Sequence, residues 1–415
     1  MLATVTAGCG ARCAEIAARK RAVIERAEVA TGPHAQVVIP FARANHFLAA
    51  LVHDQPIRAP IELPELGLFG RPTSQLSALV RDVELRPAAA GRLQFAIELE
   101  IDDPEQPITT LSVVAEIEPE LVRTADASEL VAGFGPDNLL AVRPELGRDA
   151  GHTLADAVVR WVPRRLADSL PRTVIDRTAE KLAEYLTGKA YDLLRTTLLH
   201  RLGELTRLRI RLPALPIAAT SVRSTADALT IDLTTDLPVR RGLGPGPVAS
   251  DEVIVRISQS TAAELANWSI AHGHLPEHYT RSLEPRSDGE YRPWFDYLVD
   301  DPGRPVKIHV FQDRGGCSYF EVGLRYEIAI VHDKLEVAVH DRFVESADAS
   351  TALEIALWLK QLIWGSVDSS YRAAAHTRVT VGGHRFVARI LRAAASREEL
   401  TFTLGFAAPV GAPAS

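Results

Sequence analysis

Alternating apolar and polar positions mark several β-strands in the chain. In RLQFAIELEI, residues 92–101, Leu93, Phe95, Ile97, Leu99 and Ile101 occupy every second position. A period of two places these side chains on one buried face of a strand. The same alternation recurs in TTLSVVAEIEPEL (109–121) and KLEVAVHDRF (334–343), and proline and glycine turns lie between such segments. The pattern predicts antiparallel meanders.

A longer apolar period marks two helical regions. In residues 154–205 a stripe at helical spacing faces one side, formed by Ile175, Ala179, Leu182, Leu186, Ala190 and Leu193. The segment ALEIALWLKQLIW, residues 352–364, is apolar most of the way round. Both regions are typical of helices that pack an apolar face against a sheet.

The two halves of the chain share one plan. VVIPFARANHFLAALV, residues 37–52, reads as a short strand followed by a helix, and VIVRISQSTAAELANWSIAHGHLPEHY, residues 253–279, reads the same way. Each opening precedes several strands, a long helix and a last strand, which are TRLRIRLPALPI (206–217) and ELTFTLGFA (399–407). A repeated order of this kind predicts two similar modules.

The predicted organisation follows from this repeat. Residues 1–35 form an N-terminal tether or short helix, residues 36–239 a first module and residues 253–415 a second. Residues 240–252, which contain RRGLGPGP, form the linker. The fold class is α+β, with a highly curved antiparallel sheet wrapped around a long amphipathic helix in each module.

Composition and charge narrow the function. The 415 residues include 46 basic and 53 acidic side chains, which gives a formal net charge of −7. A general nucleic-acid binder needs a concentrated basic surface, so a nucleic-acid partner is not expected. Three cysteines occur, Cys9, Cys13 and Cys317, and none forms a Cys-x-x-Cys pair that would indicate a structural zinc.

The strand-helix opening at Val253–Leu275, with V-x-V-x-I-S before A-x-x-L-A-N-W, resembles the tubular lipid-binding (TULIP) superfamily. Within it, the likeness is to the family of bactericidal/permeability-increasing protein and the lipopolysaccharide- and cholesteryl-ester-binding proteins. ALTIDLTTDLPVRR, residues 228–241, resembles that family's entry into its second half. The resemblance covers Val37 to about Ala407 and implies two tandem barrels that hold lipid between helix and sheet. The family's disulfide has no evident counterpart, because Cys9 and Cys13 precede the first strand and Cys317 stands alone in the second half. The basic tip of endotoxin-binding members is also missing.

The resemblance implies a protein that binds and carries lipid, as acyl chains or sterol, in an elongated apolar cavity. Apolar lining suits such a ligand, because each buried methylene contributes about 0.8 kcal/mol. Helix residues expected to face the lipid are Phe47, Leu51, Ile175, Leu182 and Leu186 in the first half, and Leu265, Trp268, Ile355, Leu359, Leu362 and Ile363 in the second. The alternative is a structural or interaction subunit of an envelope or secretion complex, with barrels filled by side chains.

The sequence contains no recognisable catalytic motif, so the protein is not expected to be an enzyme. Gly-x-Ser-x-Gly, His-Glu-x-x-His and Walker A motifs are absent from the sequence. His272, His274 and His278 could together bind zinc. However, Gly273 and Pro276 end a helix there, and histidines are favoured at helix C-termini. We therefore expect a helix end rather than a metal site, and no cofactor.

The N-terminus suggests a location. Thr6-Ala7-Gly8-Cys9 resembles the end of a bacterial lipoprotein signal, in which the cysteine is acylated, although the preceding charged and apolar regions are missing. Acylation of Cys9 would tether the protein to a membrane. We expect a periplasmic or membrane-anchored protein of a bacterial cell envelope, or a cytoplasmic one if the chain begins as given. Which lipid it binds, whether it transports or senses, and its oligomeric state do not follow from the sequence.

Overall fold

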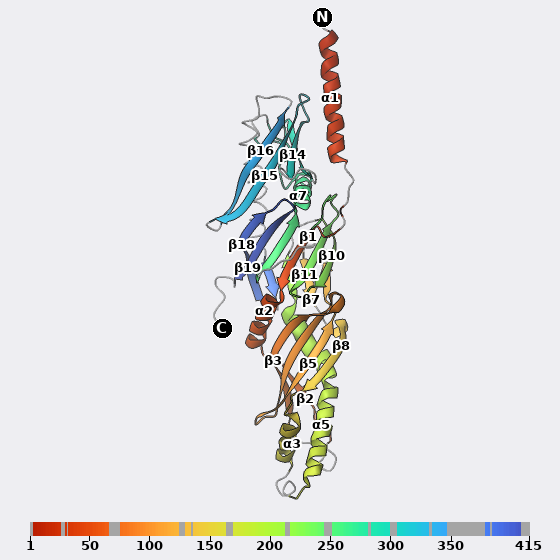
Figure 1. Ribbon diagram of the computed structural model, residues 1–415, viewed down its shortest axis with the longest axis vertical. Helices are drawn as coiled ribbons and strands as arrows, with labels where there is room; N and C mark the ends of the chain where they lie inside the picture. Colours follow the sequence, from red (N-terminus) through yellow and green to blue (C-terminus); the bar gives the residue numbers. More distant parts are fainter. Residues whose placement is uncertain are drawn as a thin grey trace.

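The computed structural model describes residues 3–25, 30, 32–65, 75–123, 129–133, 136–162, 169–211, 216–244, 251–280, 284–298, 305–331, 334–346, 378–381 and 384–407. Its strands form three sheets of ten, five and four strands. The molecule is elongated, and the ten-stranded sheet lies between the other two (Figure 1). The mixed α+β class is therefore confirmed.

The five-stranded sheet, in the order β2-β3-β4-β5-β8, carries the strict alternation seen in the sequence. Phe95, Ile97 and Leu99 of β4 are at most 1% exposed, because they face helices across a closed core. Glu98 points to the other, solvent side. The strands are β2 (Arg58–Ile61), β3 (Leu76–Pro87), β4 (Leu93–Asp102), β5 (Pro107–Ile117) and β8 (Leu139–Leu146).

Helices cover the inner face of this sheet. Leu182 and Leu186 lie on α5, the long helix that runs along the sheet (Figure 1), and both join the same core as β4. Proline at the N-cap position begins α5, where the missing N–H costs nothing. The helices are α2 (Phe41–Asp54), α3 (Ala150–Trp161), α5 (Arg172–Leu193), the π-helical turn η4 (Leu194–Leu198) and α6 (Leu199–Thr206).

The ten-stranded central sheet joins the two halves of the chain. Its order is β10-β11-β1-β12-β19-β18-β17-β9-β7-β6. Its strands are β1 (Ala35–Pro40), β6 (Glu120–Arg123), β7 (Glu129–Gly133), β9 (Leu208–Arg211), β10 (Ile217–Ser224), β11 (Ala228–Thr235), β12 (Val253–Ser258), β17 (Arg378–Val381), β18 (His384–Ala395) and β19 (Glu399–Ala407).

The opening strand of each half lies in this one sheet. β1 and β12 are antiparallel neighbours, and Val37 pairs with Val255. The prediction of a separate sheet wrapped around a helix in each half is therefore corrected: opening strands with the same pattern can pair with each other. The predicted strand-helix openings themselves are confirmed, since α2 follows β1 and α7 (Gln259–Ala271) follows β12. Residues 228–235, expected as an entry to the second half, form β11, which pairs back onto β1.

The four-stranded sheet, β13-β14-β15-β16, packs its inner face against α7. Ile308, Val310 and Val322 are fully buried there. The strands are β13 (Tyr291–Tyr297), β14 (Val306–Gln312), β15 (Tyr319–Val331) and β16 (Lys334–Ser346). The helix predicted at 352–364 lies outside the described residues.

The N-terminal segment, expected as a tether or a short helix, is largely helical. Residues Ala3–Ile24 form α1, a helix of 22 residues at one end of the molecule (Figure 1). A disulfide joins its Cys13 to Cys317, which is 304 positions away in the sequence. The expectation that Cys317 stands alone is therefore wrong, because a contact between the chain's first helix and its second half leaves no trace in local spacing.

Candidate functional site

An apolar surface covers one face of the central sheet over four adjacent strands. Val37 on β1 pairs with Ile231 on β11 and with Val255 on β12, and Val255 pairs with Phe402 on β19. Directly paired residues share a face, so these side chains form a continuous row. The rows on either side are also apolar. We call this surface the apolar sheet face; it consists of Ala35, Val37, Ile39, Leu229, Ile231, Leu233, Val253, Val255, Ile257, Leu400, Phe402 and Leu404.

Most of the apolar sheet face is half-buried, and two of its residues, Ile231 and Val253, are buried. Val37, Val255 and Phe402 are neither buried nor fully exposed, unlike the inner residues of β4. Four strands at ordinary spacing make the surface about 14 Å wide. Leu229 also packs against the core of the first module, so this surface continues into that interior.

The opposite face of the same strands carries a ladder of polar side chains beside a small apolar cluster of Val38, Ala228 and Ile254. Gln36 on β1 donates to Asp232 on β11 over 2.8 Å and accepts from Arg256 on β12 over 2.9 Å. Arg256 also donates to Glu399 on β19, over 2.6 and 3.0 Å. Arg223 on β10 donates to Asp232 at the other end, over 2.5 Å. Polar groups are thus confined to one face, and the apolar sheet face carries no side chain that requires a hydrogen-bonding partner.

The predicted lipid-facing residues of the first half lie in packed core. Ile175, Leu182, Leu186 and Leu51 are 6%, 0%, 1% and 5% exposed. Phe47 is half-buried. Their inward orientation is as expected, but Leu182, Leu186 and Ile175 contact other side chains of one core cluster rather than an open space.

The second-half candidates are placed differently from expectation. Leu265 and Trp268 on α7 are half-buried, while Glu264, Asn267 and Ile270 form the buried side of this helix. Trp268 stacks on His272, with ring centroids 4.3 Å apart, and lies 5.4 Å from His274. Four further candidates, Ile355, Leu359, Leu362 and Ile363, lie outside the described residues.

The buried side of α7 includes polar residues, and hydrogen bonds to neighbouring groups make their burial possible. Asn267 bonds both the N–H and the carbonyl of Phe295 on β13. Burial raises the pKa of Glu264 to about 7, and the nearby Asp296 also raises it. Neither residue stands out in the sequence, since both interrupt the apolar stripe that marks an inward face.

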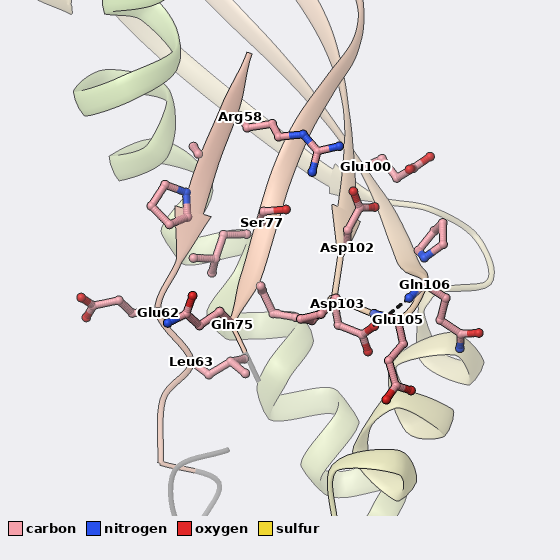
Figure 2. A pocket seen from close by; sticks show the side chains of 16 residues that line it. Arg58, Glu62, Leu63, Gln75, Ser77, Glu100, Asp102, Asp103, Glu105 and Gln106 are labelled. Carbon is pink, nitrogen blue, oxygen red and sulfur yellow. Dashed lines mark hydrogen bonds between the residues drawn. The ribbon is translucent and has the colours of Figure 1, made fainter. Parts of the chain in front are cut away.

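Two hollows lie on the first module, and both are lined by polar as well as apolar residues. The larger hollow has a volume of about 980 Å³. It is lined by β2, the start of β3 and the turn between β4 and β5. In Figure 2 Arg58 reaches toward Asp102 and Glu100. Burial, together with Glu100, raises the pKa of Asp102. A smaller hollow of about 370 Å³ is lined by Gln94, Ser112, Val114, Arg143, Pro144 and Glu145. The charged groups in these linings do not suit an acyl chain.

The adjacent acid Asp103 stabilises the turn at the larger hollow. Its Oδ1 accepts from the N–H groups of Glu105 and Gln106, each over 2.9 Å. Arg160 and Trp161 of α3 donate to its Oδ2. These bonds keep the pKa of Asp103 below its ordinary value although burial alone would raise it. Asp103 therefore has a structural role.

The described residues contain no group of three His, Cys, Asp or Glu side chains arranged to hold a metal ion. His272 ends α7, and its Nδ1 lies 2.8 Å from the carbonyl oxygen of Trp268. Cys9 lies within α1. None of the helices searched is long and apolar enough to cross a membrane.

The chain is similar to known proteins in its three-dimensional structure. No protein-family model and no curated protein matches it. P47 of Clostridium botulinum E1 is similar in structure with a TM-score of 0.44 and 8% identity, over 90% of this chain and 98% of that one. P47 from Clostridium botulinum A2 gives a TM-score of 0.42 and 8% identity, over 90% and 97%. A lipopolysaccharide binding protein gives a TM-score of 0.28 and 10% identity, over 91% and 100%.

Proposed function

We propose that this chain binds lipid acyl chains, or a sterol, against the apolar sheet face. The observation that carries the proposal is the in-register apolar surface over β11, β1, β12 and β19, most of whose side chains are only half-buried. Extended apolar surfaces that a protein does not fully bury are typical of binding sites. An acyl chain needs no polar partner, and each methylene it buries contributes about 0.8 kcal/mol.

The site in this proposal differs from the one expected between helix and sheet. Around α5 the interior is filled by Leu182, Leu186 and their neighbours. The apolar sheet face meets that interior at Leu229, so a long chain lying on the sheet has an apolar path toward the first module. Binding of this kind suits carriage or sensing of lipid.

Location is part of the same proposal. The Cys13–Cys317 disulfide supports an oxidising compartment, such as the bacterial periplasm or the cell exterior, because cytosolic thiols are kept reduced. Within an envelope, acylation of Cys9 would add a membrane tether, and mass spectrometry of the protein purified from its native source tests this point.

The closed core around α5 favours a second candidate, an interaction subunit with side-chain-filled modules. Protein partners and no lipid would then be recovered with the chain. Organic extraction of the purified protein followed by mass spectrometry separates the two. Lipid in the extract, and uptake of a fluorescent fatty acid, support the lipid proposal; a protein repeatedly free of lipid that takes up no probe contradicts it.

A matched pair of variants locates the binding surface. Val255→Thr places a hydroxyl on the apolar sheet face with little change of volume, and Thr403→Val removes one from the opposite face of the neighbouring strand. An unpaired hydroxyl against an apolar ligand costs about 1–2 kcal/mol, so we expect roughly tenfold weaker uptake for Val255→Thr. Thr403→Val is expected to leave uptake unchanged.

A further inference from the structure

The N-terminal helix α1 is fastened to the outer face of the four-stranded sheet. Beside the disulfide from Cys13, Arg19 donates to Glu321 on β15 over 2.9 Å. The guanidinium of Arg19 also lies over the ring of Tyr319, 4.6 Å from its centroid. Lys20 pairs with Asp313 and lies over the ring of Phe311. Two adjacent cations of the helix thus each meet one carboxylate and one aromatic ring.

The surface beneath α1 is unusual for the outside of a sheet. His309 pairs with Glu321 across β14 and β15, and Phe311 pairs with Tyr319, so these residues share the outer face. His309 and Glu321 are only 4% and 3% exposed. Lys307 donates to the second oxygen of Glu321 over 2.7 Å. We call α1 the arm. The surface beneath it, made of His309, Phe311, Asp313, Tyr319 and Glu321, is the arm-binding face.

Charge complementarity specifies what the arm-binding face accepts. Glu321 and Asp313 supply two negative charges, while Tyr319 and Phe311 supply ring faces that attract cations. A helix with an adjacent arginine and lysine satisfies all four. Arg19 and Lys20 of α1 are such a pair, and every copy of the chain carries it.

The connection between α1 and the body of the molecule is short. α1 ends at Ile24, and Ala30 already donates a backbone hydrogen bond to Val239. The arm has a short connection, and every copy of the chain carries the surface that binds it. This arrangement favours domain swapping, in which two chains exchange identical elements. The disulfide opposes exchange as long as it is closed.

We propose that the arm-binding face is an interaction surface for α1 of a second copy of this chain, reached when the Cys13–Cys317 disulfide opens. A thiol reductant opens it: two reductant thiols become one disulfide, and Cys13 and Cys317 each gain a proton as free thiols. The oxidised reductant re-forms the bond by the reverse exchange, now between copies. Both cysteine residues are half-buried rather than packed in core.

Two single-cysteine full-length chains test this exchange. Both carry Cys9→Ser; one adds Cys317→Ser and keeps Cys13 on its arm, and the other adds Cys13→Ser and keeps Cys317 on its face. They are mixed in a glutathione redox buffer, and disulfide-linked dimers are resolved on non-reducing gels. We expect a mixed dimer linked Cys13 to Cys317, identified by peptide mass spectrometry, in excess of the dimers formed by either chain alone.

Charge reversal separates docking from random collision of thiols. Arg19→Glu with Lys20→Glu on the arm-donating chain should lower the mixed dimer about tenfold, because both charge-assisted contacts become repulsive. Arg21→Glu, at an exposed position of the same helix, should lower it far less. Circular dichroism verifies that each chain is folded. Absence of the mixed dimer from folded chains, or equal yields with the reversed and the native arm, overturns the proposal.

Discussion

Asn267 on α7 completes both backbone hydrogen bonds of Phe295 on β13: its Nδ2 donates to the carbonyl and its Oδ1 accepts from the N–H, each over 2.8 Å. Asn267 is 5% exposed, so water cannot replace these bonds. We predict that Asn267→Ala lowers the free energy of unfolding by about 2–4 kcal/mol, since two buried backbone groups lose their partner. Urea denaturation measures the change, and Ser269→Ala on the same helix is the control. A change below about 1 kcal/mol would contradict this role.

Glu264 makes stability depend on pH. Burial, assisted by Asp296, raises its pKa from 4.5 to about 7, while Asn267 and Arg240 act in the opposite direction. Between these two pH values the unfolded chain has lost the proton and the folded chain has kept it. The unfolded state therefore binds fewer protons, and stability falls as pH rises from about 4.5 to about 7.

The variant Glu264→Gln removes this titration and keeps a hydrogen-bonding side chain. We predict that it raises stability by up to about 3 kcal/mol at pH 8 and changes it little at pH 4.5. Denaturation at both pH values gives the answer, and an equal effect at both would show that Glu264 does not titrate between them.

Arg256 holds the polar ladder of the central sheet together. It is 7% exposed and bonds Gln36 and Glu399 on the two flanking strands. We predict that Arg256→Met destabilises the fold by about 3 kcal/mol or more, because Glu399 and Gln36 lose their cationic partner. Arg392→Met, at an exposed position of β18, is the matched control and should cost less than about 0.5 kcal/mol.

Trp268 tests whether α7 contacts ligand. Its ring stacks on His272 at the end of its own helix. We therefore predict that Trp268→Phe leaves fatty-acid uptake within about twofold of the unchanged protein, a difference below about 0.5 kcal/mol. A large loss of uptake in a folded Trp268→Phe protein would contradict this prediction. It would indicate that the ligand contacts α7, as the sequence alone predicted.

The sequence predicts individual strands and helices, but it does not predict which strands pair with each other. The alternation in β4 and the openings before α2 and α7 follow from periodicity, which is a property of neighbouring residues. The pairing of Val37 with Val255 joins residues 218 positions apart, and two apolar strands carry no mark of which strand they will meet.

The proposed site differs from the predicted one for a related reason. An apolar stripe such as that of α5 identifies an inward face, but packed core and ligand lining use the same residues. The buried side of α7 was missed because Glu264 and Asn267 are polar, and only their partners make burial possible. The disulfide between Cys13 and Cys317 likewise depends on where α1 docks.

Photolabelling with a diazirine fatty acid shows directly where lipid binds on the protein. After irradiation of the full-length protein, peptide mass spectrometry identifies the labelled residues. The account predicts labels within β1, β12 and β19, on peptides that contain Val37, Val255 and Phe402, and their loss in competition with unlabelled fatty acid. Labelling confined to other segments, or no competed labelling, would contradict lipid binding on the apolar sheet face.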